Sequence, residues 1–413
     1  MIKSITKKLL PSFLLNWYYQ FFPALGALIY GFPSKKLTVI GVTGTNGKSS
    51  VVELLTSIFQ ESGIDVCSIS SIRFQIKDEI VQNKLKMTMP GRMKIQKFLR
   101  KAVNQGCKYA VIEVTSEGIK QFRHKFIDFK TAVITNLTKE HIESHGSFEN
   151  YKKAKAELFK NVEVAVVNLD DKNAEYFLSF GAQEKYGFTT TDRENKERTI
   201  KILRAENIIG SDFSIKDTEI NLKLKGRFNI YNALTAACIA LSEGIELQYI
   251  KTGLEKIELI SGRLEKIIDK PFSVYVDYAH TPDALMNVYK TLSGDSRLVC
   301  VLGSCGGGRD KWKRPELGKI ASQYCDKIIL TNEDPYNEDP KKILKDIEAG
   351  LINHKDYQLI IDRKEAIEHS LSLARPGDTV IITGKGREPW MCVAGGKKIP
   401  WDDRKIVEQK LKL

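Results

Sequence analysis

The chain has 413 residues, of which 28% are charged and 42% hydrophobic, and this composition is typical of a globular protein with two or three domains. Its formal charge of +13 indicates anionic partners such as nucleotides, phosphorylated intermediates or an acidic membrane face. No long run of lysine and arginine interleaved with aromatic residues occurs, so no nucleic acid partner is expected.

The first 36 residues begin basic and continue apolar. Lys3, Lys7 and Lys8 precede a run rich in leucine and aromatic residues. Prolines and polar residues interrupt this run before it reaches the roughly 20 apolar residues that span a bilayer. No small-residue cleavage site of a signal peptide is obvious. Two interpretations stay open: a helix docked on the first domain, or an interfacial segment, residues 1–33, whose aromatic side chains contact a membrane.

Residues 41–50, GVTGTNGKSS, predict a phosphate-binding loop between a strand-like run at 37–40 and a helical pattern at 49–60. Glycines in this place let backbone N–H groups turn toward a phosphate, and the helix N-terminus adds positive charge. Lys48 is expected to reach the β- and γ-phosphates, and the hydroxyl of Ser49 or Ser50 to hold Mg²⁺. Val42 replaces a glycine of the strict Walker pattern, but the context favours an ATP-type site over a plain glycine turn.

From residue 37 onward, strand-like and helix-like runs alternate, which predicts a mostly parallel sheet covered on both faces. The strands are expected at 109–114, 131–135 and 162–168, and the helices at 93–104 and 148–159. Residues 189–225 are polar with short strand-like runs, so we expect an antiparallel excursion there, followed by a long helix from about 229 to 242.

The alternation restarts after Ser261, which predicts a second doubly wound unit. Its strands are expected at 273–276, 298–302, 327–330 and 379–382, and its helices at 282–292, 315–324, 340–351 and 363–373. The expected fold is therefore α/β: an N-terminal segment at 1–36, a P-loop ATPase-type central domain with a mostly parallel sheet at 37–260, and a Rossmann-like C-terminal domain at 261–413.

Acidic residues and histidines stand directly after two of the predicted strands. Glu113 ends the first of them, where a carboxylate can hold Mg²⁺ opposite the phosphate loop. His141 and His145, two of only six histidines, lie among acidic residues after the second. Their clustering favours a metal or phosphate site. The seven cysteines, in contrast, are scattered without a Cys-x-x-Cys pair, so neither a zinc ribbon nor a disulfide framework is indicated and a reducing cytoplasm is expected.

Taken together and in order, the motifs of this chain resemble the Mur ligase family, the ATP-dependent enzymes that form the amide bonds of peptidoglycan precursors. The motifs are GTNGKS at 44–49, EVTS at 113–116, TNLT at 135–138 followed by His141, YKKAKAELF at 151–159, GRFNIYNA at 226–233, DYAHTP at 277–282, GGGRDKWKRP at 306–315, DR at 362–363, GKGRE at 384–388 and DDR at 402–404. The match covers about residues 37–405. Within the family the chain is most similar to the branch that adds a diamino acid to UDP-MurNAc-L-Ala-D-Glu.

The resemblance implies phosphorylation of a substrate carboxylate by ATP and attack of an amine on the acyl phosphate. It implies Lys48, Glu113, His141 and Lys155 as catalytic residues, with Lys155 carbamylated. Two Mg²⁺ sites are implied, held by Ser49, Glu113 and His141. The implied ATP contacts are Gly44, Thr45, Asn46, Gly47, Lys48, Ser49, Ser50, Asn229, Asn232, Arg263 and Asp277. The implied substrate contacts are Thr115, Ser116, Arg123, His145, Arg309, Asp334, Tyr336, Gly384 and Glu388.

Departures from the family pattern concern the substrates. Members that add diaminopimelate carry DNPR where this chain has EDPY at 333–336. Tyr336 removes an arginine that would clamp the distal carboxylate, so lysine or another amine is expected rather than diaminopimelate. Arg387 and Glu117 each replace a histidine. The family's UDP-gripping domain is not found before residue 37, which leaves a UDP-linked and a lipid-linked glycopeptide acceptor both open.

The expected protein is thus a cytoplasmic ligase that joins an amino acid to a muramyl-peptide acceptor, and a contact of residues 1–33 with the inner face of the membrane stays open. Two alternatives are a ligase similar to folylpolyglutamate synthetase and a nucleotide-binding membrane scaffold without turnover. The aspartate motifs at 277–280 and 402–404 disfavour the first alternative. The joint presence of Lys48, Glu113, His141 and Lys155 disfavours the second.

Overall fold

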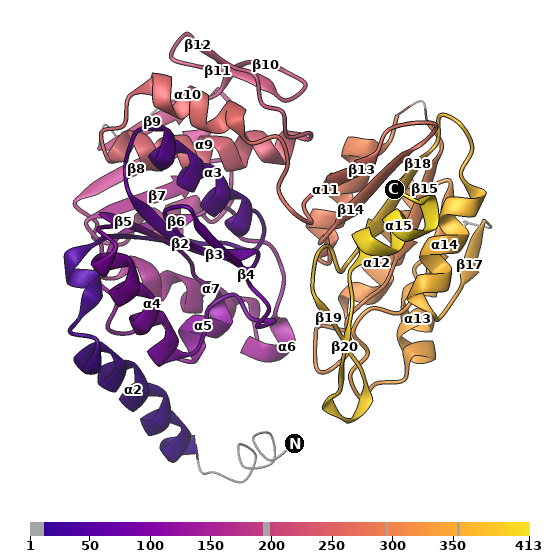
Figure 1. Ribbon diagram of the computed structural model, residues 1–413, viewed down its shortest axis with the longest axis horizontal. Helices are drawn as coiled ribbons and strands as arrows, with labels where there is room; N and C mark the ends of the chain where they lie inside the picture. Colours follow the sequence, from indigo (N-terminus) through magenta and orange to yellow (C-terminus); the bar gives the residue numbers. More distant parts are fainter. Residues whose placement is uncertain (1–11, 193–198, 295, 353–355) are drawn as a thin grey trace. The chain divides into compact units, whose positions relative to one another are not determined.

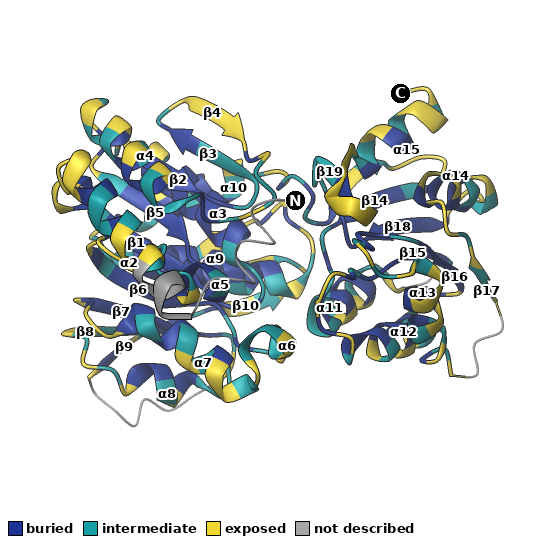
Figure 2. Cartoon of the chain, turned by 90° about the horizontal axis from the view of Figure 1, so that it is seen from below, coloured by how far each residue is buried: buried dark blue, intermediate teal, exposed yellow. Residues whose placement is uncertain are grey.

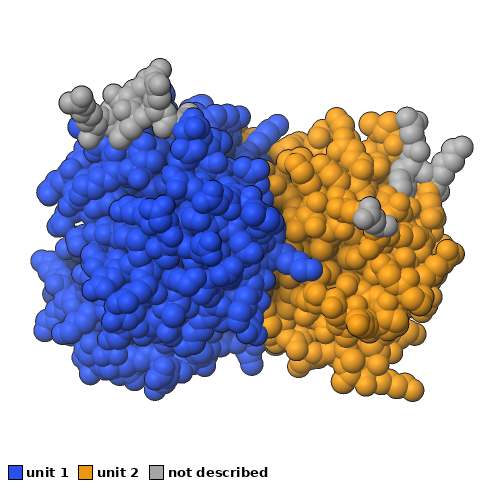
Figure 3. Space-filling model, turned by 90° about the horizontal axis from the view of Figure 1, so that it is seen from above, with its two compact units in different colours: residues 1–139, 148–258 blue, residues 140–147, 259–413 orange. Residues whose placement is uncertain are grey.

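The computed structural model describes residues 12–192, 199–294, 296–352 and 356–413, and the chain divides into two compact units (Figure 1, Figure 3). Unit 1 comprises Met1–Lys139 and Phe148–Glu258, and unit 2 comprises Glu140–Ser147 and Leu259–Leu413. Both units have largely parallel sheets covered by helices, which confirms the expected α/β class. The octapeptide 140–147, placed within the central domain by sequence, groups with unit 2.

Within the described residues, unit 1 contains a nine-stranded sheet with the order β4-β3-β2-β5-β1-β6-β7-β8-β9. Its strands are β1 (Thr38–Thr43), β2 (Val66–Ile69), β3 (Arg73–Ile76), β4 (Glu79–Gln82), β5 (Tyr109–Glu113), β6 (Phe129–Ile134), β7 (Val164–Asn168), β8 (Glu184–Thr189) and β9 (Ile200–Arg204). All neighbours from β2 to β9 pair in parallel, whereas β3 and β4 pair antiparallel. The central strands are continuous apolar runs because both of their faces are buried.

The register of the central strands gathers the chemistry-bearing loops at one edge of the sheet. Val42 is opposite Glu113, and Thr43 is opposite Ile134, so β1, β5 and β6 end at the same level. Because these strands are parallel, the segments that follow them emerge together.

Helices cover both faces of this sheet (Figure 1). One face carries α3 (Lys48–Glu61), α9 (Arg227–Ser242) and α10 (Leu247–Lys256), which pack against one another. The other carries α4 (Arg92–Asn104), α5 (Ser116–Lys120) and α7 (Phe148–Ala156), the last continued by η2 (Glu157–Phe159). The short α8 (Ala174–Leu178) follows β7, and η1 (Pro33–Lys36) precedes β1.

The expected antiparallel excursion begins later than predicted. Strand β9 pairs in parallel with β8 and belongs to the main sheet, which corrects the assignment of residues 189–204. The excursion consists of β10 (Glu206–Ile209), β11 (Asp212–Ile215) and β12 (Thr218–Ile220), which form an antiparallel sheet of their own. The parallel pairing of β9 depends on a long connection, which no local pattern reveals.

Unit 2 is built on a second sheet, whose described strands have the order β13-β14-β18-β15-β16-β17. They are β13 (Glu265–Ile268), β14 (Ser273–Asp277), β15 (Leu298–Leu302), β16 (Lys327–Leu330), β17 (Tyr357–Leu359) and β18 (Thr379–Thr383), all parallel except the edge strand β13. Its helices are α6 (Ile142–His145), α11 (Pro282–Leu292), α12 (Lys313–Tyr324), α13 (Pro340–Glu348), α14 (Arg363–Leu373) and α15 (Asp403–Leu411). The hairpin of β19 (Trp390–Cys392) and β20 (Lys398–Pro400), with η3 (Ala394–Gly396) between them, completes the unit.

The N-terminal helix α2 (Ser12–Ile29) packs on α4 of unit 1. The Arg100 guanidinium donates to the carbonyls of Tyr30 (2.7 Å) and Gly31 (2.8 Å), and the Arg92 guanidinium lies 4.3 Å from the ring centre of Tyr19. These contacts support the docked-helix interpretation. The basic residues at positions 3, 7 and 8 lie outside the described part of the chain. In that part, no helix has both the length and the apolar character needed to cross a membrane.

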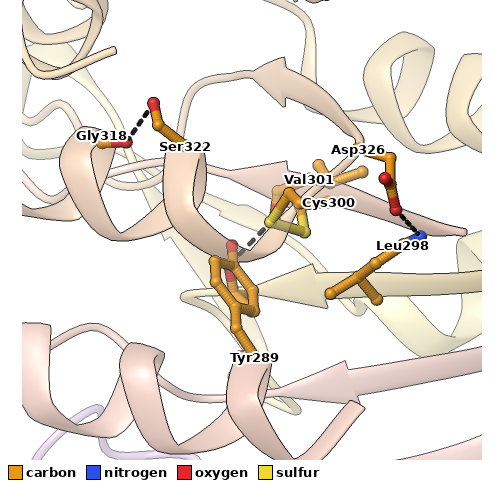
Figure 4. The surroundings of a disulfide bond; sticks show 9 residues. Tyr289, Leu298, Cys300, Val301, Gly318, Ser322 and Asp326 are labelled. Carbon is orange, nitrogen blue, oxygen red and sulfur yellow. Dashed lines mark hydrogen bonds between the residues drawn. A yellow bond between two sulfur atoms is a disulfide. The ribbon is translucent and has the colours of Figure 1, made fainter. Parts of the chain in front are cut away.

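The structure contains a disulfide that the scattered cysteines of the sequence did not indicate. Cys300 in β15 and Cys325, directly after α12, form a disulfide with a Cα–Cα distance of 6.1 Å (Figure 4). The backbone N–H of Leu298 donates to the Asp326 carboxylate (2.7 Å), which joins the start of β15 to the residue that follows Cys325. The two cysteines are separated by 25 positions without a motif, and the parallel pairing of β15 with β16, which begins two residues after Cys325, brings them together.

Candidate nucleotide and ligase site

The phosphate loop runs from the end of β1 to Lys48, the first residue of α3. Its backbone needs glycine at Gly44, where φ is +146° and a Cβ atom would lie 1.9 Å from the hydroxyl oxygen of Thr135. The Lys48 ammonium is folded over the loop and donates to the carbonyls of Gly44 (3.1 Å) and Thr45 (2.8 Å). Both carbonyls belong to the phosphate loop, so the ammonium lies at the loop that would bind the phosphates.

The segment after β6 holds this loop in place, a role that sequence reasoning missed. The backbone N–H of Asn46 donates to Asn136 Oδ1 (2.9 Å), and Asn136 Nδ2 donates back to the carbonyl of Asn46 (3.1 Å). Thr135 Oγ1 donates to the same carbonyl (2.6 Å). Thr45 Oγ1 accepts from the N–H of Thr138 (3.0 Å). The conspicuous TNLT motif therefore shapes the phosphate loop.

Glu113 lies beside the loop, within reach of a serine hydroxyl. Ser49 Oγ donates to Glu113 Oε2 (2.9 Å), and the backbone N–H of Ser71 donates to the same oxygen (2.8 Å). Glu113 is 3% exposed. A carboxylate and a hydroxyl are oxygen donors of the kind that Mg²⁺ prefers, so these residues fit a magnesium ion next to the phosphates. Ser71 was missed because it follows β2, a strand too short to produce a clear pattern.

Lys155, on α7, points at the same loop. Its ammonium nitrogen is 2.6 Å from the carbonyl oxygen of Gly44 and 4.7 Å from the ring centre of Tyr151. The residue is 1% exposed. Burial, followed by the positive charge of Lys48, holds the pKa of the Lys155 amine well below its usual value. A neutral amine is the form that reacts with CO₂ to give a carbamate, so the setting fits the modification that the resemblance implies.

The asparagines of α9 lie against the other side of the loop. Asn232 Oδ1 would be 2.3 Å from a Cβ atom at Gly47, so the two residues are in contact. Asn232 Nδ2 donates to Asn229 Oδ1 (3.0 Å), and Asn229 Nδ2 donates to the carbonyl of Lys225 (2.8 Å). Ser50 is buried in the first turn of α3. These positions bring the implied nucleotide contacts of unit 1 together around one loop.

The implied substrate contacts of unit 1 are partly engaged by the fold. Thr115 caps α5, accepting from the N–H of Gly118 (3.0 Å), and Ser116 is buried. The Arg123 guanidinium donates to the carbonyl of Met89 and to Gln121 Oε1 (2.8 Å). The side chain of Arg123 is therefore oriented by its neighbours before any substrate binds.

Other implied contacts lie in unit 2. His141 directly precedes the short α6 and His145 is its last residue, with ring centres 6.5 Å apart. The Arg263 guanidinium lies 4.6 Å from the ring centre of Tyr278. Asp277 is buried and accepts hydrogen bonds from the backbone N–H groups of Leu264 and Ala279. Asp277 therefore holds a turn of its own unit. A Mg²⁺ site shared by His141 and Glu113, which belong to different units, stays a prediction.

A buried acidic cluster surrounds Lys385 in unit 2. The Lys385 ammonium donates to Asp334 Oδ1 (3.0 Å), to Glu388 Oε2 (2.8 Å) and to the carbonyl of Trp390 (2.7 Å). Glu333 Oε2 is buried and has no hydrogen-bond partner among the described residues. Burial, and then the charge of Asp334, raises the pKa of Glu333. The raised pKa favours the neutral form of Glu333, and the carboxylates of Asp334 and Glu388 alone outnumber the single ammonium of Lys385.

The edges of this cluster are formed by further implied substrate contacts. The Gly384 backbone lies directly against the Glu333 carboxylate, and Tyr336 has a positive φ of 51°. Arg309 is exposed in the glycine-rich segment 306–315, and Tyr278 Oη donates to Glu388 Oε1 (3.3 Å). Carboxylates, an exposed guanidinium and a tyrosine thus adjoin one another in unit 2.

The motifs DR at 362–363 and DDR at 402–404 form a structural ion pair. The Arg363 guanidinium makes a two-pronged ion pair with Asp403, with Nε–Oδ1 2.9 Å and Nη2–Oδ2 2.7 Å. Both side chains are fully buried. Arg363 also donates to the carbonyl of Thr383 (2.8 Å), so the pair joins α14, α15 and β18.

Known proteins resemble most of the chain. The model of the Mur ligase middle domain matches residues 42–240, and that of the Mur ligase glutamate ligase domain matches residues 262–386. The UDP-N-acetylmuramoyl-L-alanyl-D-glutamate–2,6-diaminopimelate ligase of Syntrophomonas wolfei is 37% identical over 403 residues, 94% of this chain and 81% of the relative. A ligase of the same description from Clostridium acetobutylicum is 35% identical over 401 residues, again 94% of this chain and 81% of the relative.

Solved structures show the same likeness. A structure of a UDP-N-acetylmuramoyl-L-alanyl-D-glutamate–2,6-diaminopimelate ligase has a TM-score of 0.60 at 30% identity, covering 91% of this chain and 78% of that one. Folylpolyglutamate synthase of Mycobacterium tuberculosis has a TM-score of 0.70 at 17% identity, covering 88% and 92%. At that identity the second likeness shows a shared fold alone.

Proposed function

Because the chain belongs to the Mur ligase family of ATP-dependent enzymes that form carbon–nitrogen bonds in peptidoglycan synthesis, we propose that it joins an amino acid to the free carboxyl group of a muramyl dipeptide. The observation that supports this most strongly is the convergence of three groups on one glycine loop: the Lys48 ammonium, the Glu113 carboxylate and the buried amine of Lys155. A nucleotide-binding loop without turnover would need neither the carboxylate nor a neutral lysine.

The proposed reaction has two steps. The acceptor carboxylate attacks the γ-phosphorus of ATP, and the bond to ADP breaks, leaving an acyl phosphate. The amine of the amino acid then attacks the acyl carbon, loses a proton, and phosphate leaves as the amide forms. Lys48 would neutralise the β- and γ-phosphates, while Ser49 and Glu113 would hold Mg²⁺, which supplies further neutralisation of phosphate charge when bound.

We assign Lys155 the role of a carbamate. The neutral amine attacks CO₂, a proton leaves, and a negatively charged carbamate remains on the side chain. This change converts a cation into an anion beside the phosphate loop. The anion would sit next to Lys48 and could orient a magnesium ion, whereas a second ammonium would repel it.

For the incoming amino acid we propose a side chain that ends in an ammonium group, such as lysine. The support is the excess of carboxylates around Lys385: Asp334 and Glu388 both pair with it, and Glu388 is only partly buried. Tyr336 offers no guanidinium for a distal carboxylate. The second candidate is diaminopimelate, which the names of the relatives specify for those enzymes.

The experiment is ADP release measured with a panel of amino acids and acceptors. We expect release with lysine and UDP-MurNAc-L-Ala-D-Glu or its lipid-linked counterpart, dependent on Mg²⁺ and bicarbonate, and none with Lys48→Ala. Turnover with diaminopimelate but not lysine would replace the first candidate by the second. Release with folate and glutamate alone would remove the muramyl assignment. The acceptor that saturates at the lower concentration identifies the carrier, UDP or lipid.

We further propose a cytoplasmic protein that touches the membrane surface through its N-terminal segment. Helix α2 exposes Tyr18 and Phe21, and more fully Leu28 (68%) and Ile29 (57%). These side chains could enter the interfacial region of a bilayer. Replacing Leu28 and Ile29 by serine should reduce sedimentation with anionic liposomes, while Gln20→Ser should not. Equal partitioning of both variants and the unaltered chain would leave only the docked helix.

A further inference from the structure

The segment Glu140–Ser147, here called the strap, carries the two candidate metal-site histidines but belongs to unit 2. The chain leaves unit 1 after Lys139 and returns to it at Phe148. Within the strap, His141 directly precedes the four-residue helix α6. A helix this short cannot hold itself in place, because most of its N–H groups lack an intrahelical acceptor. Side chains of the glycine-rich segment 306–315 supply what it lacks.

Asp310 is the first of these side chains. Its Oδ1 accepts from the N–H of Glu143 (2.8 Å), and its Oδ2 accepts from the N–H of Ile142 (3.2 Å). Asp310 is 3% exposed, and both hydrogen bonds are partly buried. In return, Glu143 Oε1 accepts from the backbone N–H of Lys311 (2.7 Å). The carboxylate thus acts as a helix cap supplied from a distant part of the chain.

Lys313 holds the strap on the other side of His141. Its ammonium donates to Glu140 Oε1 (2.8 Å), and both side chains are buried. His141 itself has φ of +57°, a left-handed conformation that a residue with a side chain adopts only when its surroundings enforce it. Here the enforcing groups are the ion pair just before it and the Asp310 cap just after it.

We propose that Asp310 and Lys313 are positioning residues for His141, fixing this candidate metal ligand to unit 2 instead of to the strand it follows in sequence. The inference rests on the proposed function and adds to it the role that the family resemblance implies for His141, as a ligand of a second Mg²⁺ ion. It implies that the affinity for the second metal ion depends on Asp310, although Asp310 lies 169 positions further along the chain and its hydrogen bonds to the strap go to backbone N–H groups.

The test uses the full-length chain with Mn²⁺ as probe and a non-hydrolysable ATP analogue, with bound and free Mn²⁺ counted by electron paramagnetic resonance. Asp310→Asn keeps the size of the side chain but weakens both hydrogen bonds by removing the charge. We expect His141→Ala and Asp310→Asn each to raise the dissociation constant for one Mn²⁺ by about tenfold. In Asp310→Asn, the Mg²⁺ concentration giving half-maximal ADP release should rise by a similar factor, and excess Mg²⁺ should restore the maximal rate.

The matched control is Asp339→Asn, because Asp339 caps α13 in the same unit through the N–H of Lys341 (3.0 Å) and is remote from the strap in sequence. It should leave Mn²⁺ binding unchanged. If Asp310→Asn fails to fold by circular dichroism, Lys313→Met tests the same point. Wild-type Mn²⁺ binding in a folded Asp310→Asn variant, with weakened binding in His141→Ala, would overturn the positioning role and leave the proposed function standing. Unchanged binding in His141→Ala would overturn the metal role of His141 and this inference with it, while ATP-dependent ligation would still be judged by ADP release.

Discussion

Replacing Lys155 by methionine should change how the stability of the protein depends on pH. Methionine has a similar length and no charge, so the variant removes the amine with little loss of packing. The amine is buried, and its pKa lies well below the usual value because of burial and the nearby charge of Lys48. In the unfolded chain it returns to its ordinary value of about 10.4.

The sign of the effect follows from proton binding. At a pH between the pKa of the folded state and that of the unfolded state, the unfolded chain holds a proton on this amine and the folded chain does not. Raising the pH toward the unfolded value therefore stabilises the folded state, by up to about 1.4 kcal/mol for each pH unit. Below the pKa of the folded state, the amine is protonated in both states and adds no pH dependence to the free energy of unfolding. There it lowers the free energy of unfolding by its full amount. The methionine variant lacks the group and should lack this slope.

The assay is urea unfolding of the full chain, followed by circular dichroism, at about pH 8 and at about pH 9. We expect the free energy of unfolding of the unaltered chain to rise relative to that of Lys155→Met over this interval, by up to about 1.4 kcal/mol. Lys153→Met is the matched control, because Lys153 is exposed on the same helix. The free energy of unfolding of Lys153→Met should change with pH as that of the unaltered chain does.

Parallel curves for Lys155→Met and the unaltered chain would show that the lysine stays charged when buried, which would refute both the neutral amine and the carbamate built on it. Bicarbonate adds a second arm to the experiment. If CO₂ reacts with the folded-state amine, bicarbonate should stabilise the unaltered chain and not the variant. Lys155→Met should also lose ADP release, while Lys153→Met keeps it.

Three further outcomes are expected. Asp403→Ala leaves the Arg363 guanidinium buried without its partner and should lower the free energy of unfolding by about 3–5 kcal/mol, whereas Asp402→Ala, which removes only the cap of α15, should lower it by about 1 kcal/mol in the same urea titration. Gly44→Ala places a Cβ atom 1.9 Å from a neighbouring hydroxyl and should abolish nucleotide binding by calorimetry; a normal affinity would mean that the loop is free to rearrange. Lys48→Ala should abolish ADP release with an unchanged circular dichroism spectrum, and residual turnover would assign the phosphate contact to another cation.

Much of the fold was predictable because the strands at the centre of both sheets are long apolar runs separated by amphipathic helices. The predicted strand at 109–114 and helix at 93–104 differ from β5 and α4 by one residue at one end. The strands that were missed are short, and they include the inner strand β2 as well as the edge strand β4. Strand β4 is exposed along its whole length (Figure 2), so its sequence carries no alternation between buried and exposed positions.

The candidate site was predictable where its residues are contiguous. The phosphate loop is one uninterrupted segment whose glycines have a local conformational reason, and the structure places the Lys48 ammonium over it. Roles that depend on distant contacts were not predictable. Ser71 shares the Glu113 carboxylate with Ser49, and Arg363 proved to be the partner of Asp403 in a buried ion pair.

The sequence by itself determined the order of the elements, the phosphate loop and the family, because backbone preference and burial period are written into neighbouring residues. Only the tertiary structure decided that Cys300 meets Cys325, that Lys155 is buried against the loop, and that the octapeptide carrying His141 is held by unit 2. Each of these depends on a contact between residues far apart in the chain. Such contacts are set by strand register and by the path of the connections between elements. A local sequence pattern does not predict either of them.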